Sequence, residues 1–257
     1  MGYFYFDESI QERGAFIVGA FVYSPFDLGS SVDAVIAGAG LKPRVDEFKS
    51  NANMSSNSVA RMLRDGVGRL MGSTQVAVVV VPRADREKLG LLALGALTQL
   101  IRANGLSSEP HSVFIDQGIK VSSQELEITS RRDVVLNVHQ NQDSKLIPGI
   151  QVADLAAHHA GGMLMEQMGL VTKMVKAGAN SGYDADLEIE LGFELWAGLR
   201  YDFFKEPKTF NGDEEDMIEV ATYNVEGFGL FIAESCDTGL RNAALSRFGS
   251  CYLGCIH

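Results

Sequence analysis

Two short apolar runs in this sequence end abruptly in acidic residues. The first, Tyr3 to Phe6, ends in Asp7 and Glu8, and the second, Val113 to Ile115, ends in Asp116. Aromatic and β-branched residues favour strands, and continuous apolar runs favour strands covered on both faces, so each acid is expected where a buried strand emerges. Two such strand ends in one sheet could bring carboxylates close enough to share a cation. The alternative at each position is ordinary turn chemistry.

Asp7 and Glu8 cannot both serve one site. Successive side chains of a strand point to opposite faces, so Asp7 shares a face with Tyr5 while Glu8 shares one with Phe6. We take Asp7 as the site residue, because acids further along the chain are placed to join it. Glu8 is the second choice.

A stripe of polar residues runs along an otherwise apolar helix expected from about residue 148 to 168. Gln151, Asp154 and His158 fall at positions i, i+3 and i+7, which share one helix face. The stripe could simply be solvated, but the small apolar residues around it indicate packing against a sheet. We therefore interpret the stripe as functional. Taken alone, His158 and its neighbour His159 are interpreted as structural histidines.

The charged segment from Arg44 to Ser50 is the second candidate site. It holds Glu47 and Lys49 around one aromatic residue and has no helical periodicity. Taken alone, such a segment is typical of a solvated loop. A further lysine, Lys145, closes the polar loop that precedes the striped helix.

Length and composition predict a protein with a full-sized core, since the chain has 257 residues of which 46% are hydrophobic. It contains no uninterrupted apolar run of about 18 residues and no basic segment followed by an apolar one at its start, so we expect neither a membrane span nor a signal peptide. The expected location is the cytoplasm. Cys236, Cys251 and Cys255 are too few for a disulfide framework and are expected as thiols. A metal site formed by Cys251, Cys255 and His257 is the less favoured alternative.

The net charge of -11 would argue against a nucleic-acid partner if it were spread evenly. Residues 184–219, however, hold 12 acidic and 3 basic residues, and residues 1–183 are nearly neutral. Phosphate binding is therefore compatible with the first part of the chain. The acidic part is a candidate contact for a second copy of the chain or for a partner protein.

The order of expected elements predicts an α/β fold with a mixed five-stranded sheet flanked by helices. The first strands are expected to be antiparallel, and later ones to be joined by helical crossovers. We divide the chain into a core, residues 1–168, and an acidic C-terminal extension, residues 169–257, that packs on or completes the core. Strands are expected at residues 3–9, 15–23, 74–81, 112–117, 134–139 and 225–232, and helices at 28–41, from 55 or 58 to 71, 86–103, 122–132, 148–168 and 187–204.

Several of these pieces together resemble the domain of unknown function family 3800, which has a ribonuclease H-like fold. The pieces follow the family's order over roughly residues 3 to 232, and the most specific is the helix with Gln-Val-Ala-Asp-Leu. The chain departs from the family pattern at Ile10, often glycine in the family, and in the acidic segment and tail. The matching pieces are Phe-Asp-Glu-Ser at 6–9, Glu-Phe-Lys-Ser at 47–50, Phe-Ile-Asp at 114–116, Ser-Lys at 144–145, Gln-Val-Ala-Asp-Leu at 151–155 and Gly-Phe-Gly-Leu at 227–230.

The resemblance implies a nuclease that hydrolyses phosphodiester bonds in RNA, DNA or a hybrid. Its carboxylates would hold two Mg²⁺ or Mn²⁺ ions, which suit carboxylate oxygens and can activate water and stabilise the leaving oxygen. The metal-holding residues would be Asp7, Glu47, Asp116 and Asp154, with Lys49, Lys145 and Gln151 against the substrate and His158 as a second choice. Fold does not settle chemistry, so a non-catalytic nucleic-acid-binding or assembly module on the same fold stays open, as does another hydrolase or phosphotransferase.

Overall fold

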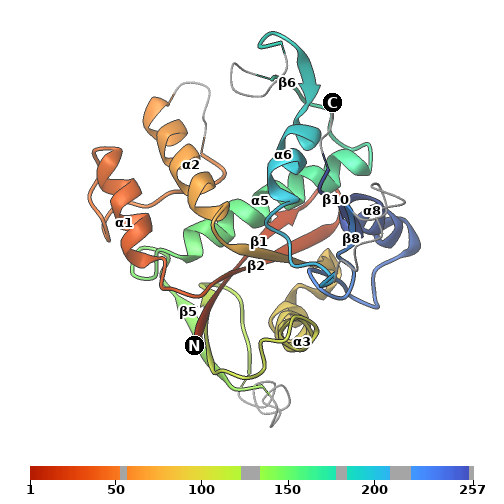
Figure 1. Ribbon diagram of the computed structural model, residues 1–257, viewed down its shortest axis with the longest axis horizontal. Coiled ribbons are helices and arrows are strands. Elements are labelled where there is room, and N and C mark those ends of the chain that lie inside the picture. The colour runs from red at the N-terminus through yellow and green to blue at the C-terminus, as the bar shows by residue number, and fades with distance from the viewer. Residues whose placement is uncertain (53–56, 123–133, 178–183, 209–220, 255–257) are drawn as a thin grey trace.

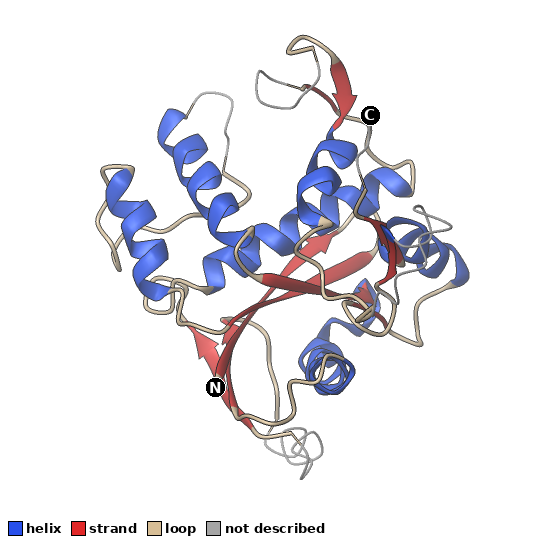
Figure 2. Cartoon of the chain, in the orientation of Figure 1, coloured by secondary structure: helices blue, strands red, loops and turns tan. Residues whose placement is uncertain are grey.

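A mixed sheet with helices on both faces forms the centre of the protein (Figures 1 and 2). The computed structural model describes residues 1–52, 57–122, 134–177, 184–208 and 221–254. None of the helices within these ranges is long and apolar enough to cross a membrane. The helix expected at residues 122–132 lies almost wholly outside the described residues.

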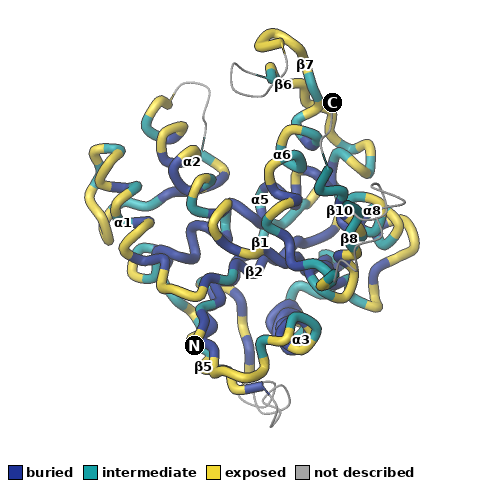
Figure 3. The backbone as a smooth tube through the Cα atoms, viewed as in Figure 1, coloured by how far each residue is buried: buried dark blue, intermediate teal, exposed yellow. Residues whose placement is uncertain are grey.

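The first three strands form an antiparallel meander. β1 (Gly2–Gln11) pairs with β2 (Phe16–Ser24), and β2 pairs with β3 (Gln75–Pro82). β2 and β3 are almost continuously buried, as expected for apolar strands covered on both faces (Figure 3). The predicted antiparallel start of the sheet is therefore confirmed.

The remaining strands of the sheet pair in parallel. β4 (His111–Asp116) lies beside β1, β5 (Leu136–Gln142) lies beside β4, and β9 (Leu230–Ile232) lies beside β3. The full order is β5-β4-β1-β2-β3-β9. The predicted count of five strands is therefore wrong by one, because a three-residue strand from the C-terminal extension completes the edge next to β3.

The two faces of the sheet are covered differently. One face packs against α1 (Gly29–Gly38), α2 (Ser58–Met71) and α5 (Ile150–Gln167), joined by α6 (Leu191–Leu199) and α8 (Thr238–Phe248). The other face packs against α3 (Leu89–Ala103), which connects β3 to β4 after a 3-10 turn at Arg83–Lys88. Tyr5 belongs to the first core and Phe6 to the second, as the strand alternation predicts.

Several predicted boundaries need correction. Asn57 caps α2 through a side-chain bond to the amide of Ala60, so the helix begins at Ser58, the later of the two expected starts. The helix expected at 187–204 is shorter and consists of α6 alone. It is preceded by β7 (Glu188–Glu190), which pairs with β6 (Met174–Lys176) as a two-stranded sheet. Of the strand expected at 225–232, only β9 forms. The residues before it make a turn, in which the amides of Phe228 and Gly229 donate to the carbonyl of Val225. The tail holds α8 and β10 (Ser250–Tyr252), which pairs with β8 (Thr222–Asn224).

The start of α5 packs closely on β1 at Gly149. A Cβ atom placed there would lie 2.3 Å from the ring of Tyr5, which is fully buried and bonded through its hydroxyl to Asp27 and to the amide of Leu28. The ring therefore has little freedom to move aside. The close approach of helix and strand depends on glycine at this position.

We predict that Gly149→Ala destabilises the protein by about 1–3 kcal/mol, the usual cost of overpacking a core. Gly162→Ala is the matched control, because Gly162 lies in the same helix and a Cβ atom added there would meet nothing within 4 Å. It should stabilise the protein by about 0.5–1 kcal/mol through helix propensity. Urea unfolding of both variants checks this, and equal effects would contradict the packing argument.

Candidate functional site

Asp116 is the last residue of β4, and Asp7 lies in the neighbouring parallel strand β1. β1 does not end at its acid, because it stays paired with β2 as far as Gln11. The register of β1 and β4 pairs Phe6 with Ile115, so the two acids come next in line. Tyr5 stacks on Phe114, with ring centroids 5.6 Å apart, which shows that the alternate residues of both strands share the α5 face. Adjacent strands are separated by about 4.8 Å. The two carboxylates therefore lie side by side on the face of the sheet that α5 covers.

Asp7 is an unusually buried acid, with 9% of its surface exposed. Its Oδ1 accepts a hydrogen bond of 2.7 Å from the amide of Glu8. Burial, followed by the negative charges of Asp116 and Asp154, raises the pKa of Asp7 to about 9. At neutral pH the Asp7 carboxyl therefore holds a proton unless a cation compensates the surrounding charge.

Asp116 belongs to the same electrostatic cluster. Burial is the main cause that raises the pKa of Asp116, and the negative charges of Asp154 and Glu47 add to it. The amide of Gln117 and the ammonium of Lys49 act in the opposite direction. β1, β4, α5 and the charged segment thus all contribute charge to one place.

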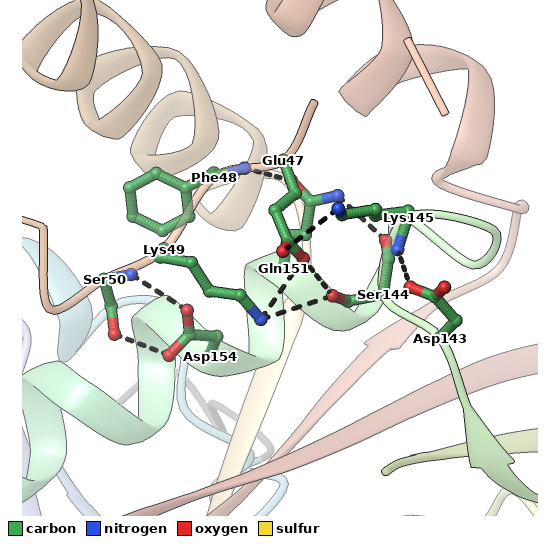
Figure 4. Close-up of polar contacts among 9 residues, drawn as sticks. All are labelled: Glu47, Phe48, Lys49, Ser50, Asp143, Ser144, Lys145, Gln151 and Asp154. Carbon is green, nitrogen blue, oxygen red and sulfur yellow. Dashed lines mark hydrogen bonds and ion pairs between the residues drawn. The ribbon is translucent and has the colours of Figure 1, made fainter. Parts of the chain in front are cut away.

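Asp154 fastens the charged segment to α5. Its Oδ2 accepts a bond of 2.9 Å from the amide of Ser50, and its Oδ1 accepts one of 2.5 Å from the Ser50 hydroxyl (Figure 4). Ser50 is buried, with 6% of its surface exposed. Interpreting residues 44–50 as a fully solvated loop is therefore wrong for its last part.

Gln151 provides a second attachment one helical turn earlier. It has no exposed surface. Its Oε1 accepts a bond of 2.8 Å from the amide of Phe48, and its Nε2 donates one of 2.8 Å to the carbonyl of Ser144. The solvated interpretation of the helix stripe is therefore wrong at this residue. Gln151 also presents no exposed atom to a bound substrate, contrary to its expected substrate-binding role.

Glu47 stands at the partly exposed rim of the cluster. Its Oε2 accepts a bond of 2.6 Å from the hydroxyl of Ser144 and lies 3.2 Å from Nζ of Lys49, and its Oε1 lies 3.9 Å from Nζ of Lys145. Burial works to lower the pKa of Lys49, but its bond to Glu47 and the charges of Glu47, Asp116 and Asp154 outweigh this and raise it. The two lysines therefore lie where a phosphate could reach them beside the carboxylates.

The second-choice residues are placed differently. Glu8 lies on the α3 face, 3.5 Å from Arg86, and burial, partly offset by Arg86, raises its pKa to about 7. His158 is half-buried on α5, and burial together with Arg64 lowers its pKa. His159 is bonded to Arg64 at 3.0 Å, in line with a structural histidine.

The described cysteines and the cleft beside α3 are separate from the four acids. Cys236 and Cys251 are buried and free, and Cys255 and His257 lie outside the described residues. A cleft of about 750 Å³ between α3 and residues 226–235 is lined by none of the four acids. We place the candidate site on the α5 face of the sheet, where the end of β4 at Asp116 lies beside Asp7 of β1.

The donor set fits a hard divalent cation, because it consists of carboxylates with buried, mutually repelling charge. In the part of the chain that the structure describes, no three His, Cys, Asp or Glu side chains stand close enough to hold an ion as they are. The four acids are therefore neighbours whose side chains would have to move closer together to coordinate an ion. Sequence reasoning gave no role to Ser50 and Ser144, although both lie within the matching pieces.

Comparisons with known proteins add little to this geometry. No family model matches the chain, and no curated protein does. Among solved structures, the complex of PCNA with RNase HII from Archaeoglobus fulgidus is similar at 15% identity, covering 72% of this chain and 83% of that one with a TM-score of 0.39. A likeness of this size assigns neither a fold family nor an activity.

The raised pKa of Asp7 predicts a specific dependence of stability on pH. The pKa is about 9 in the folded protein against 3.8 ordinarily, so between these values the folded state binds the extra proton. The free energy of unfolding should therefore fall as pH rises, by up to about 1.4 kcal/mol per pH unit from this group. Asp7→Asn should remove that loss and be more stable than wild type at about pH 8, with a smaller difference at about pH 5.

Urea unfolding at both pH values measures this difference. Asp186→Asn is the control, since Asp186 is 82% exposed in its ion pair with Lys176. Its effect should be small at both values. A stability difference for Asp7→Asn that does not change with pH would show that Asp7 is ionised in the folded protein.

Proposed function

We propose that this protein is a divalent-metal-dependent nuclease of the ribonuclease H-like type, a member of the domain of unknown function family 3800. The observation that carries the proposal is buried Asp7 of β1 beside partly buried Asp116 at the end of parallel strand β4, with Asp154 close enough to raise the pKa of Asp7. Buried acids with such perturbed pKa values concentrate at functional sites.

The sheet supports the ribonuclease H-like part of the proposal. Leaving out β9, its order is β5-β4-β1-β2-β3, with β2 alone opposed to its neighbours. This is a mixed five-stranded sheet of the kind that the family resemblance implies. The acids of the matching pieces come from β1, β4, α5 and the 47–50 segment.

In the proposed site, Asp7 and Asp116 would hold Mg²⁺ or Mn²⁺ from the sheet, Asp154 from α5 and Glu47 from the rim. Two such ions can activate a water and stabilise the leaving oxygen of a phosphodiester. Asp7 must give up its proton for this, so metal binding should release protons. Lys49 and Lys145, at 3.2 and 3.9 Å from Glu47, would contact phosphates of an RNA, DNA or hybrid substrate.

A non-catalytic nucleic-acid-binding module on the same fold is the second candidate. Both Asp154 oxygens are already bonded to Ser50, and Glu47 is paired with Lys49. These contacts favour a cluster that serves structure alone. The two candidates differ in whether the carboxylates bind metal.

Calorimetric titration with Mn²⁺ separates the two candidates. Wild type should bind Mn²⁺ with proton release, and Asp7→Asn and Asp116→Asn should each abolish binding. Cleavage of labelled single-stranded, duplex and hybrid oligonucleotides with Mn²⁺ should fall at least about a hundredfold in both variants. Asp186→Asn should bind and cleave as wild type does, since Asp186 lies in the β6–β7 hairpin region away from the cluster.

Two outcomes would contradict the nuclease. A wild-type protein that binds oligonucleotides but not Mn²⁺ would favour the non-catalytic module. Cleavage that persists in Asp7→Asn and Asp116→Asn would mean that the activity resides in other residues. The same oligonucleotides identify the substrate class if cleavage occurs.

A further inference from the structure

Gln151 is a fully buried amide on a helix face whose neighbours are apolar. Val152, Ala153 and Leu155 beside it are all buried. An amide buried without partners is costly, whereas Gln151 bonds at both ends, to the Phe48 amide and to the Ser144 carbonyl. The two partners come from segments 96 residues apart in the chain, so one side chain ties both of them to α5.

Both hydrogen bonds of Gln151 fix residues that adjoin or contact Glu47. Phe48 is its neighbour in the chain, and its buried ring, 1% exposed, anchors the backbone from the other side. Ser144, whose carbonyl accepts from Gln151, donates its own hydroxyl to Oε2 of Glu47 at 2.6 Å. Figure 4 shows Gln151 lying between the 47–50 segment and the Ser144 loop. The position of the Glu47 carboxylate is therefore determined by two routes that meet at this amide.

We propose that Gln151 is a positioning residue that sets where Glu47 stands relative to Asp7 and Asp116. The inference rests on the proposed metal-dependent function. Gln151 touches neither substrate nor metal in this role; it orients a ligand through the Phe48 backbone and the Ser144 hydroxyl. Residues that orient metal ligands commonly change metal affinity by about 10- to 100-fold when they are replaced.

The role can be separated from general support of the fold. Asp154 holds Ser50 through two further bonds that do not involve Gln151. A variant at position 151 therefore keeps the segment attached at its far end. It loses the two hydrogen bonds, to the Phe48 amide and the Ser144 carbonyl, that lie nearest Glu47.

Gln151→Met keeps the length of the side chain and removes both hydrogen bonds. Amide hydrogen exchange at Phe48 should become faster while exchange at Ser50 changes less, and the dissociation constant for Mn²⁺ should rise about tenfold or more. Gln167→Met is the matched control, because Gln167 is the last residue of the same helix and its side chain bonds to exposed Ser246 at 3.3 Å. Its metal affinity should equal that of wild type.

Gln151→Glu provides a conditional rescue. A protonated carboxyl can accept from the Phe48 amide and donate to the Ser144 carbonyl, as the amide does, whereas a carboxylate cannot donate. A buried Glu titrates well above its ordinary range, so the ratio of variant to wild-type dissociation constants should be near one at about pH 6 and rise by about pH 9. Titratable groups around the position are Glu47 and Lys49 on the segment, Asp143 and Lys145 on the loop, and Asp154 on the helix; the ratio to wild type removes their common effect.

The results have distinct meanings. Faster Phe48 exchange in Gln151→Met with weakened Mn²⁺ binding, and rescue of Gln151→Glu at low pH, would establish the positioning role. Faster exchange with unchanged Mn²⁺ affinity would overturn it and leave the metal site intact. Absence of Mn²⁺ binding in wild type itself would instead refute the proposed function, and the inference with it.

Discussion

The attachment of the 47–50 segment to α5 is the interaction on which the candidate site depends. Gln151 and Asp154 lie three positions apart on one helix face. They accept hydrogen bonds from the amides of Phe48 and Ser50, which lie two positions apart in a segment that is neither helix nor strand. The spacing of the two acceptors on α5 therefore matches the spacing of the two amides. Through this match a loop without regular structure is held beside Asp7 of β1 and the end of β4.

This attachment also explains why α5 must lie close to the sheet. Gly149 allows the helix to start against the ring of Tyr5, and Tyr5 in turn bonds to Asp27 and Leu28 at the entry to α1. The same face of β1 that carries Tyr5 carries Asp7 two residues later. Packing of the helix and burial of the acid therefore have one geometric cause.

Burying Asp7 beside Asp116 and Asp154 costs folding free energy, because each negative charge disfavours ionisation of the next. Nearby cations do not remove this cost, since Lys49 pairs with Glu47 at the rim and Arg86 pairs with Glu8 on the other face. Ser50 compensates Asp154 by hydrogen bonds, whereas among the described residues Asp7 accepts a hydrogen bond only from the amide of Glu8. A buried acid that lowers stability in this way indicates a functional role, because strongly perturbed pKa values concentrate at functional sites.

Much of the core and part of the candidate site follow from the sequence alone. Alternation along β1 places Asp7 and Glu8 on opposite faces, and the spacing of Gln151 and Asp154 places them on one face of α5, because both depend only on local backbone geometry. The antiparallel start, the crossover helix before β4 and the acid at the end of β4 follow from equally local patterns, whereas β1 continues past Asp7 because it stays paired with β2. Glu47 came from the family resemblance, since its own surroundings are typical of a solvated loop.

Other features were decided only by the tertiary structure. The partners of Gln151 are 103 and 7 residues away, and no local periodicity specifies a bond between a helix side chain and a distant backbone amide. The sequence predicts a strand at 225–232, but only Leu230–Ile232 form β9, because only these residues pair with β3. Likewise, the burial that raises the pKa of Asp7 arises where β1, β4 and α5 meet, since desolvation depends on what covers a residue and not on its neighbours in the chain.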